Sequence, residues 1–276
     1  MVVKIKKLEE VSNTLNFMRG NFMPKVLFIK LIERLREIGR DESKSAEEWA
    51  KKQSVDFSKL ANDIDKTLWF ESETSTVEIT KNSSNTLNEL KFKGIDLGGG
   101  GAIELTYFLT RLIKPENILE TGVAAGWSTY SFLLAIEKNK KGNLYSSDLP
   151  YFRIKDPKKY IGILVPSQLR RDNWTLKLDG DDINFKSFLV PGRKFQLVHW
   201  DSDKRKIARV NFLTQISAFL SENSVVIMDD IQNNLAFKEF VTSRNLAFFV
   251  IHNQDKYVGV ILYGSYGDLI LGLRMA

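Results

Sequence analysis

The sequence predicts an α/β fold with a seven-stranded, mostly parallel sheet whose last strand is antiparallel, preceded by a helical N-terminal extension. From Asp96 onward, short apolar runs alternate with amphipathic segments, which is typical of a parallel sheet with crossover helices. The chain closes on two β-rich runs, Ala247–His252 and Tyr257–Tyr263, joined by a short turn that predicts a final hairpin. Residues 1–95 lack this alternation and carry helical patterns instead.

Five strands and their connecting helices are expected before the final hairpin. The expected strands cover residues 117–121, 143–148, 174–178, 195–200 and 224–229, and the expected helices cover 104–113, 127–139, 182–189, 205–221 and 234–243. A helical cap, extension and linker over residues 1–95 and a ligand-binding domain over residues 96–276 follow from this division.

The N-terminal extension carries three helical signals and one loop signal. The first helix has Pro24 at its start and an apolar face that runs from Val26 to Ile38. Ser45-Ala46-Glu47-Glu48 has the pattern of a capping box and predicts the start of a short helix. A third helix is expected over Phe57–Trp69, and the Ser, Thr and Asn content of residues 71–88 predicts a loop or linker.

The composition excludes several kinds of site. The 276 residues contain no cysteine, so disulfides, thiolate metal sites and cysteine nucleophiles are excluded, and two histidines leave oxygen ligands and a hard cation as the metal chemistry available. No apolar leader or membrane-spanning run is present, which favours a cytoplasmic protein without a membrane partner. The formal charge of +6 comes from lysines interleaved with acids, which favours a solvated basic surface over nucleic-acid binding.

A glycine-containing turn after the first strand of the sheet is the strongest candidate for a ligand site. The strand ends at Glu120, the turn contains three small residues, and a helix begins with Trp127 and Ser128, whose free N–H groups suit an anion. The small residues of the turn are Gly122, Ala124 and Gly126. Small residues at such a turn let a ligand approach the backbone.

Two acids at neighbouring strand ends complete a nucleoside pocket. Asp148 ends the second strand, where a carboxylate can accept hydrogen bonds from ribose hydroxyls, and Asp181 follows the third strand, where a loop can meet adenine. The GxxxG spacing of the turn differs from the GxGxxG of dinucleotide-binding folds. Together with Glu120 inside the strand end, this spacing favours S-adenosylmethionine over NAD.

A second group of acids follows the fourth and fifth strands. Asp201 ends one strand, and Asp229 and Asp230 end the next, so adjacent parallel strands would bring the three carboxylates together. Clustered carboxylates repel one another unless a cation joins them, and an all-oxygen set suits Mg²⁺ or Ca²⁺. Such an ion would lower the pKa of a substrate hydroxyl. Lys204 would accept the proton if its own pKa were depressed. The alternative is that the acids only cap a helix and form a surface turn.

These residues resemble class I S-adenosylmethionine-dependent methyltransferases, of the macrocin O-methyltransferase and cephalosporin-hydroxylase-like group and, more distantly, catechol O-methyltransferase. The resemblance covers about residues 96–262 and implies a Rossmann-like methyltransferase sheet. Its most specific parts are Gly98–Ala102, Leu119–Thr129, Ser147–Pro150, Val165-Pro166, Asp201–Asp203 and Met228–Ile231.

The resemblance also implies roles for individual residues. It implies that Glu120, Gly122, Ser128 and Asp148 bind the cofactor and that Asp201, Asp229 and Asp230 hold a divalent metal, with Mg²⁺ the first choice. Lys204 stands where catechol-type enzymes carry a catalytic lysine, whereas the macrocin-like group more often has histidine there. Asn233 and Asn234 would assist the metal or the substrate. The segment Pro150–Arg171 would close over the site, with Tyr151, Phe152, Tyr160 and Trp174 near the acceptor.

The sequence therefore predicts a metal-assisted O-methyltransferase that acts on a hydroxyl of a small molecule or a glycan, with the N-terminal extension as a cap or dimerisation element. An RNA or protein methyltransferase remains an alternative, although the Asn/Asp-Pro-Pro-aromatic pattern of amino-methylating enzymes is absent at Asp201-Ser202-Asp203-Lys204. A non-catalytic or oxidative protein with the same sheet is the other alternative.

Overall fold

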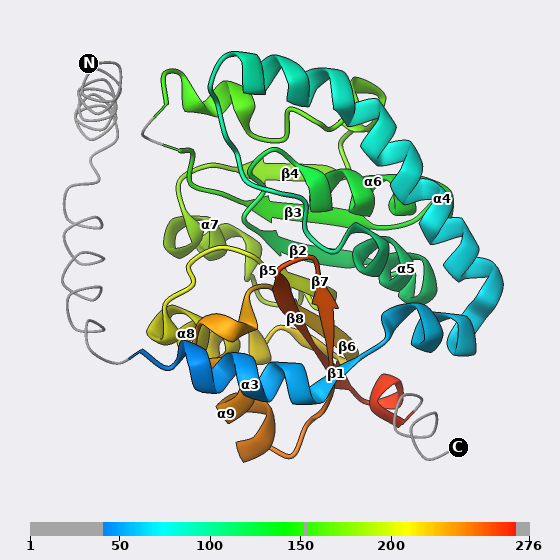
Figure 1. Ribbon diagram of the computed structural model, residues 1–276, viewed down its shortest axis with the longest axis vertical. Coiled ribbons are helices and arrows are strands. Elements are labelled where there is room, and N and C mark those ends of the chain that lie inside the picture. The colour runs from blue at the N-terminus through cyan, green and yellow to red at the C-terminus, as the bar shows by residue number, and fades with distance from the viewer. Residues whose placement is uncertain (1–40, 152–153, 269–276) are drawn as a thin grey trace.

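A single mixed sheet forms the centre of the protein, whose computed structural model describes residues 41–151 and 154–268. Eight strands of this described part pair in the order β1-β7-β8-β6-β5-β2-β3-β4 (Figure 1). The strands are β1 (Ser54–Val55), β2 (Asn117–Thr121), β3 (Asn143–Ser147), β4 (Trp174–Lys177), β5 (Phe195–Trp200), β6 (Leu220–Met228), β7 (Ala247–Asn253) and β8 (Lys256–Tyr263). Strands β2 to β8 lie where the sequence predicts them.

The last strand is antiparallel to both of its neighbours, as predicted. β8 pairs with β6 through Val226↔Ile261 and with β7 through Val250↔Gly259, whereas the other paired strands run parallel. The sheet also gains a strand that the sequence did not predict. β1 pairs with the edge of β7 through Ser54↔Val250, so the N-terminal region contributes directly to the sheet.

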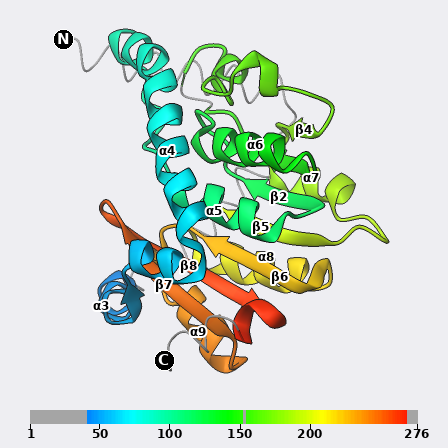
Figure 2. The same ribbon diagram turned by 90° about the vertical axis from the view of Figure 1, so that its right-hand side faces the viewer.

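Helices cover both faces of the sheet (Figure 2). One face is covered by α4 (Phe57–Phe92), α5 (Ile103–Ile113) and α6 (Trp127–Asn139), and the other by α3 (Ser43–Gln53), α7 (Asp181–Phe188), α8 (Lys206–Ser217) and α9 (Ala236–Ser243). Three 3-10 helices, η1 (Pro157–Tyr160), η2 (Ser167–Leu169) and η3 (Ile231–Asn233), lie in the loops. The chain passes from one face to the other at β1, which follows α3 and precedes α4.

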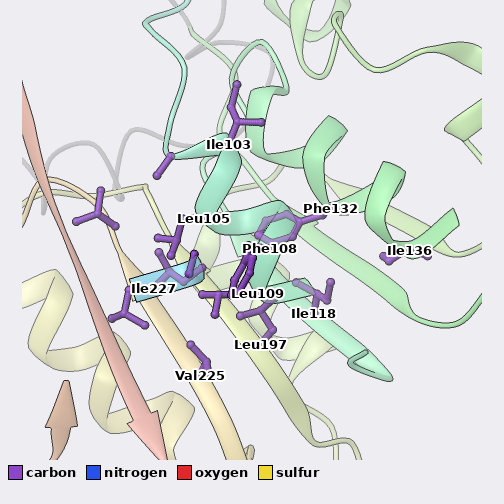
Figure 3. Packing of buried hydrophobic residues seen from close by; sticks show 14 of the residues in the cluster. Ile103, Leu105, Phe108, Leu109, Ile118, Phe132, Ile136, Leu197, Val225 and Ile227 are labelled. Carbon is purple, nitrogen blue, oxygen red and sulfur yellow. The ribbon is translucent and has the colours of Figure 1, made fainter. Parts of the chain in front are cut away.

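The core beneath α5 and α6 fixes these helices to the centre of the sheet. Figure 3 shows Phe108 and Leu109 of α5 lying over Ile118 of β2 and Leu197 of β5, while Phe132 comes from α6. These side chains are almost fully buried. Burial of side chains of this size stabilises a fold by about 1.5–3 kcal/mol each, so the β2–α6 connection above them is held on a rigid base.

The region predicted as a loop over residues 71–88 is helical, which corrects that prediction. α4 runs from Phe57 to Phe92, with a break in helical geometry at Asp65, and Asp56 caps its start by accepting from the N–H groups of Ser58 and Lys59. The small polar side chains favour a loop in sequence, but here they face the core. The buried residues of this part are Ser72, Ser75, Ile79, Ser83 and Leu90, which share one helical face.

A polar network ties α4 to α5. The Glu71 carboxylate accepts from Tyr107 Oη at 2.7 Å and from Arg111 Nε at 2.8 Å. The guanidinium of Arg111 holds the pKa of Glu71 below its usual value. α4 therefore packs against α5 through a charged pair as well as through its serine face.

Two further expectations concern the N-terminal region. Helix α3 begins at Ser43, so Ser45 and Glu48 lie inside it and no capping box forms. The helix predicted from Val26 to Ile38 lies outside the described residues. Within the described ranges, no helix is both long enough and apolar enough to cross a lipid bilayer.

Candidate active site

The turn between β2 and α6 has an unusual backbone because three of its residues have positive φ. The φ values are 79° at Gly122, 47° at Ala124 and 99° at Gly126. A Cβ at Gly122 would overlap the carbonyl oxygen of Asp201, and one at Gly126 would lie 2.8 Å from the Cα of Gly162. Both glycines are therefore required by backbone conformation and by close protein neighbours. The sequence-based explanation, ligand approach, is not needed to account for them.

Glu120 lies beneath this turn, where protein encloses it completely. Its carboxylate accepts hydrogen bonds from Ser128 Oγ at 2.6 Å, Ser146 Oγ at 2.7 Å and Thr129 Oγ1 at 2.8 Å. Burial raises the pKa of Glu120 to about 7, although the three hydroxyls oppose the shift. Glu120 thus joins β2, β3 and α6, and its predicted contact with a cofactor stays a prediction.

Asp148 reaches the turn from the end of β3. Its carboxylate accepts from the backbone N–H groups of Ala124 at 2.7 Å and Leu149 at 2.6 Å. Burial raises the pKa of Asp148 to about 6, and the nearby charge of Asp181 adds to the effect. A carboxylate thus lies beside the turn, as the nucleoside-pocket hypothesis requires.

Asp181 joins two strand ends near Asp148. It begins α7 and accepts from Ser147 Oγ, at the end of β3, and from Ser202 Oγ, which follows β5, each at 2.6 Å. These bonds align the carboxyl ends of the sheet around the turn. The predicted contact of Asp181 with adenine is not tested by this arrangement.

The glycine run Gly98–Gly101 passes over the same edge of the sheet. A Cβ at Gly100 would lie 3.5 Å from the Trp127 indole, and one at Gly101 would lie 3.8 Å from Asp229 Oδ2. The Trp127 Nε1–H is buried and has no hydrogen-bond partner among the described residues. No side chain of the described ranges caps α6, whose Ncap residue is Gly126. Donors without a protein acceptor in the described ranges therefore lie at the start of α6, next to the glycine run.

The carboxylates predicted at the ends of β5 and β6 do share one edge of the sheet. The two strands are parallel neighbours with Trp200 opposite Met228, and the Asp229 N–H donates to the Trp200 carbonyl at 3.0 Å. Asp201 and the pair Asp229-Asp230 follow these strands directly. This adjacency confirms the inference from strand order.

Lys204 lies between two of the three carboxylates. Its ammonium forms an ion pair with Asp201 and another with Asp230 Oδ2 at 2.8 Å. Burial opposes the charge, but the two carboxylates outweigh it and raise the pKa of Lys204. The condition for Lys204 to act as a base, a depressed pKa, is therefore not met in this arrangement.

Asp229 differs from Asp201 and Asp230, which form ion pairs with Lys204. It is buried, and neither carboxylate oxygen has a hydrogen-bond partner among the described residues. Burial, together with the charge of Asp201, raises its pKa to about 7. Arg209 lies behind this turn, fully buried, and donates through Nη2 to the carbonyls of Asp229 at 3.0 Å and Asp230 at 2.8 Å.

The donor chemistry of this edge fits a hard divalent cation in part. A buried carboxylate with two unpaired oxygens is a group that a cation would stabilise. In residues 41–151 and 154–268, however, no three acidic, histidine or cysteine side chains are arranged as a metal site. Lys204 supplies the positive charge between Asp201 and Asp230 instead.

Other residues singled out in the sequence have structural roles here. His199 is a buried core residue against Phe132, and burial lowers its pKa to about 4. Asn234 donates to the Lys204 carbonyl at 2.8 Å and accepts from the Ala236 N–H, so it fixes the loop between β5 and α8 that carries Lys204. Trp174 donates to Ser146 Oγ at 3.0 Å.

The segment that follows β3 contacts the site through Tyr151, whose hydroxyl donates to the Leu97 carbonyl at 3.4 Å. Farther along the segment, the N–H groups of Gly162 and Leu164 donate to the carbonyls of Ala124 and Ala125, so this part lies against the turn. Phe152, which was expected near the acceptor, lies outside the described residues.

Comparison with protein families accounts for this arrangement. Residues 119–231 match the family model described as a methyltransferase domain. The chain contains a methyltransferase domain. The matched residues include the β2–α6 turn, Asp148 and the acids after β5 and β6. No curated protein matches the chain.

Solved structures with the same fold are methyltransferases as well. The O-methyltransferase TomG from Streptomyces achromogenes, solved in complex with S-adenosylmethionine, is 17% identical, with a TM-score of 0.50 over 69% of this chain and 96% of that chain. A candidate caffeoyl-CoA O-methyltransferase from Staphylococcus aureus is 12% identical, with a TM-score of 0.52 over 71% of this chain and all of that one. At these identities the likeness establishes the methyltransferase fold.

Proposed function

We propose that the protein transfers a methyl group from S-adenosylmethionine to a hydroxyl oxygen of a small molecule or of a sugar within a glycan. The observation that carries this proposal is the gathering of Asp201, Asp229, Asp230 and Lys204 at the carboxyl ends of β5 and β6, beside the β2–α6 turn. Ligands of open α/β sheets bind at this end of the strands.

The turn supplies the features that a nucleoside with an amino-acid tail needs. Asp148 is a carboxylate with acceptor capacity beside Ala124, and ribose hydroxyls are donors for such a group. The N-terminus of α6 and the Trp127 Nε1–H are donors without a protein acceptor in the described ranges, and they suit the carboxylate of the donor's amino-acid end.

Transfer needs two reactants in line and a destination for one proton. The hydroxyl oxygen forms a bond to the methyl carbon as the carbon–sulfur bond breaks, so S-adenosylhomocysteine leaves as a neutral thioether. The hydroxyl proton must reach a base or solvent, and Lys204 accepts it only when its ammonium has been deprotonated. The contribution of this chain is chiefly to position the reactants and to stabilise charge.

We further propose that a divalent cation, Mg²⁺ first, binds Asp201, Asp229 and Asp230. The unpaired oxygens of Asp229 support this ligand set. When bound there, the ion would lower the pKa of the acceptor hydroxyl. It would also take over the charge balance of Asp201 and Asp230 that Lys204 now provides.

Calorimetric titration with S-adenosylhomocysteine tests the donor site. We expect saturable binding in the wild type, at least tenfold weaker binding in Asp148→Asn, since about 1.4 kcal/mol corresponds to tenfold, and unchanged binding in Asp182→Asn. Asp182 is the matched control because it is an exposed acid at the start of α7. Absence of binding to the folded wild type would reject the methyltransferase proposal.

Titration with Mg²⁺ in the presence and absence of chelator tests the cation separately. Uptake that disappears in Asp229→Asn, with S-adenosylhomocysteine binding retained, is the expected result. Metal-independent methyl transfer by the chelated protein would remove the cation from the proposal while leaving the transfer itself.

A further inference from the structure

A cavity of about 460 Å³ lies beside the predicted cofactor turn. It is open to solvent on one side and bordered by the C-terminal end of α4, by residues 94–98 and by Ala125 of the turn. Its apolar lining consists of Leu87, Leu90, Ile95, Leu97 and Ala125. Its volume lies in the range of about 300–1,000 Å³ that is typical of small-molecule sites.

The wall of this cavity is packed. Leu90, Leu97 and Ala125 are almost fully buried and form one cluster with Leu164 of the segment after β3. Gly162 and Leu164 hydrogen-bond to the turn on the same side. Side chains packed in this way are held in place, so the cavity belongs to the folded structure and needs no opening step.

One wall of the cavity leads to the carboxyl ends of β5 and β6, where Asp229 lies. Leu97 and Gly98 line the cavity, and Gly101, three residues later, faces Asp229 Oδ2. Three residues of extended chain span at most about 10 Å. The Tyr151 hydroxyl donates to the Leu97 carbonyl at 3.4 Å, so this side chain lies beside the same wall.

We propose that this cavity binds an apolar, aliphatic part of the methyl acceptor. The acceptor hydroxyl would lie beside Asp201, Asp229 and Asp230, no more than about 10 Å away. The inference rests on the proposed function and narrows its substrate class. It favours a hydroxylated small molecule with an aliphatic body over an unsubstituted glycan.

The lining decides between these two substrate classes. Five aliphatic residues surround the cavity, and the charged side chains that border it, Lys91 and Asp96, belong to exposed residues. A sugar placed against this wall would leave several hydroxyls without hydrogen-bond partners, which is costly. An alkyl chain loses no hydrogen bond there.

A homologous series of primary alcohols from pentanol to decanol provides a direct test. Binding is measured by calorimetry with S-adenosylhomocysteine present. Each methylene that enters the cavity is expected to tighten binding about threefold to fourfold, as burial of one CH₂ predicts. Leu87→Trp fills the cavity and should abolish this gain for the longer alcohols.

Two other variants make the test specific. Lys91→Trp fills the cavity from an exposed position and tests the same expectation if Leu87→Trp does not fold. Val77→Trp changes an exposed residue elsewhere on α4 and should keep the wild-type series. A wild-type series without a gain per methylene, or the same gain in both filled variants, would overturn the proposal.

The two proposals fail in different ways in these samples. Lack of S-adenosylhomocysteine binding by the wild type would reject the donor site, whatever the alcohols do. Normal S-adenosylhomocysteine binding with no chain-length dependence would reject the aliphatic cavity alone.

Discussion

Two buried carboxylates at the same edge of the sheet, Glu120 and Asp229, have opposite surroundings. Glu120 accepts from three hydroxyls of β3 and α6, and both of its oxygens are paired. Asp229 has no partner for either oxygen among the described residues. A buried charge costs several kcal/mol unless it is paired. The paired carboxylate therefore needs no ligand to stabilise its charge, and the unpaired one marks a place where a cation would be stabilised.

The pKa values alone would hide this difference. Both are raised to about 7, and burial is the first cause in each case. Hydroxyl donors oppose the shift at Glu120, whereas the charge of Asp201 adds to it at Asp229. The surroundings of each group, and not its pKa, separate a carboxylate with paired oxygens from a candidate ligand of a cation.

Arg209→Met should have the largest effect on stability and tests whether the region around Asp229 depends on a buried cation. The substitution removes two hydrogen bonds to the carbonyls of Asp229 and Asp230 and a charge that interacts with four carboxylates. Breaking a buried charge arrangement costs about 3–5 kcal/mol. Urea denaturation measures the loss. Lys194→Met, which removes an exposed bond to the Ala218 carbonyl, should cost less than about 1 kcal/mol.

Retention of wild-type stability in Arg209→Met would contradict this interpretation. It would mean that the carboxylates around Asp229 do not depend on the Arg209 guanidinium. The difference in surroundings between Asp229 and Glu120 would then have no measurable effect on stability.

Glu120→Gln sharpens the comparison through pH. The folded pKa of about 7 lies above the unfolded value of 4.5, so the folded state binds the proton more strongly and loses stability as pH rises between these values. The loss is about 3 kcal/mol, since one pKa unit corresponds to about 1.4 kcal/mol. Glutamine does not titrate, and hydroxyls that face its NH2 group must turn to accept from it in place of donating. The variant should therefore gain on the wild type by up to this amount between pH 4.5 and 7.

Urea denaturation of both proteins across this pH range gives the comparison. Parallel stability profiles would show that Glu120 has the same pKa in the folded and unfolded states. Its burial would then make no contribution to the pH dependence of stability.

Asp229→Asn and Thr129→Val should change the stability of the protein in opposite directions. Asp229→Asn removes an unpaired buried charge and should stabilise the ligand-free protein by about 1–2 kcal/mol above pH 7, while it weakens Mg²⁺ uptake. Thr129→Val removes one donor to Glu120 and should destabilise the protein by about 1 kcal/mol. Thermal denaturation at pH 8 compares them. Two changes of the same sign would remove the distinction between the regions.

The sheet could be predicted from the sequence because its strands are buried apolar runs that end on polar residues. Strands β2, β5 and β6 follow this rule most clearly, and their order places Asp201 beside Asp229 and Asp230. β1 could not be predicted because it has two residues, Ser54 and Val55, whose pairing with β7 depends on a partner almost two hundred residues away. Short edge strands of this kind carry no pattern of their own.

The second half of α4 was missed because its buried face is made of small polar residues. Ser72, Ser75 and Ser83 share that face with Ile79, and serine in sequence favours loops. The buried positions recur at helical spacing, but serines at three of them hide the pattern from a search for hydrophobic residues. The cavity beside Leu87 and Leu90 was missed with it.

The charge balance of the site could not be read from the sequence either. The order of acids predicted a cation among Asp201, Asp229 and Asp230, and the spacing of Lys204 three residues after Asp201 suggested a base. Only the structure shows that the Lys204 ammonium lies between two of these acids. Which charge neutralises which depends on side-chain geometry, and sequence spacing does not fix it.

Lys256→Met should have the smallest effect because its ion pair with Asp230 is long, at 3.8 Å, and Lys204 already holds the same carboxylate. The expected cost is about 0.5 kcal/mol, as for partly exposed ion pairs. In a Lys204→Met background, Lys256 would be the nearest remaining ammonium for Asp230, so its removal should cost more. A double-mutant cycle measures this coupling. Strict additivity would show that the two lysines do not share Asp230 and that Lys204 alone balances its charge.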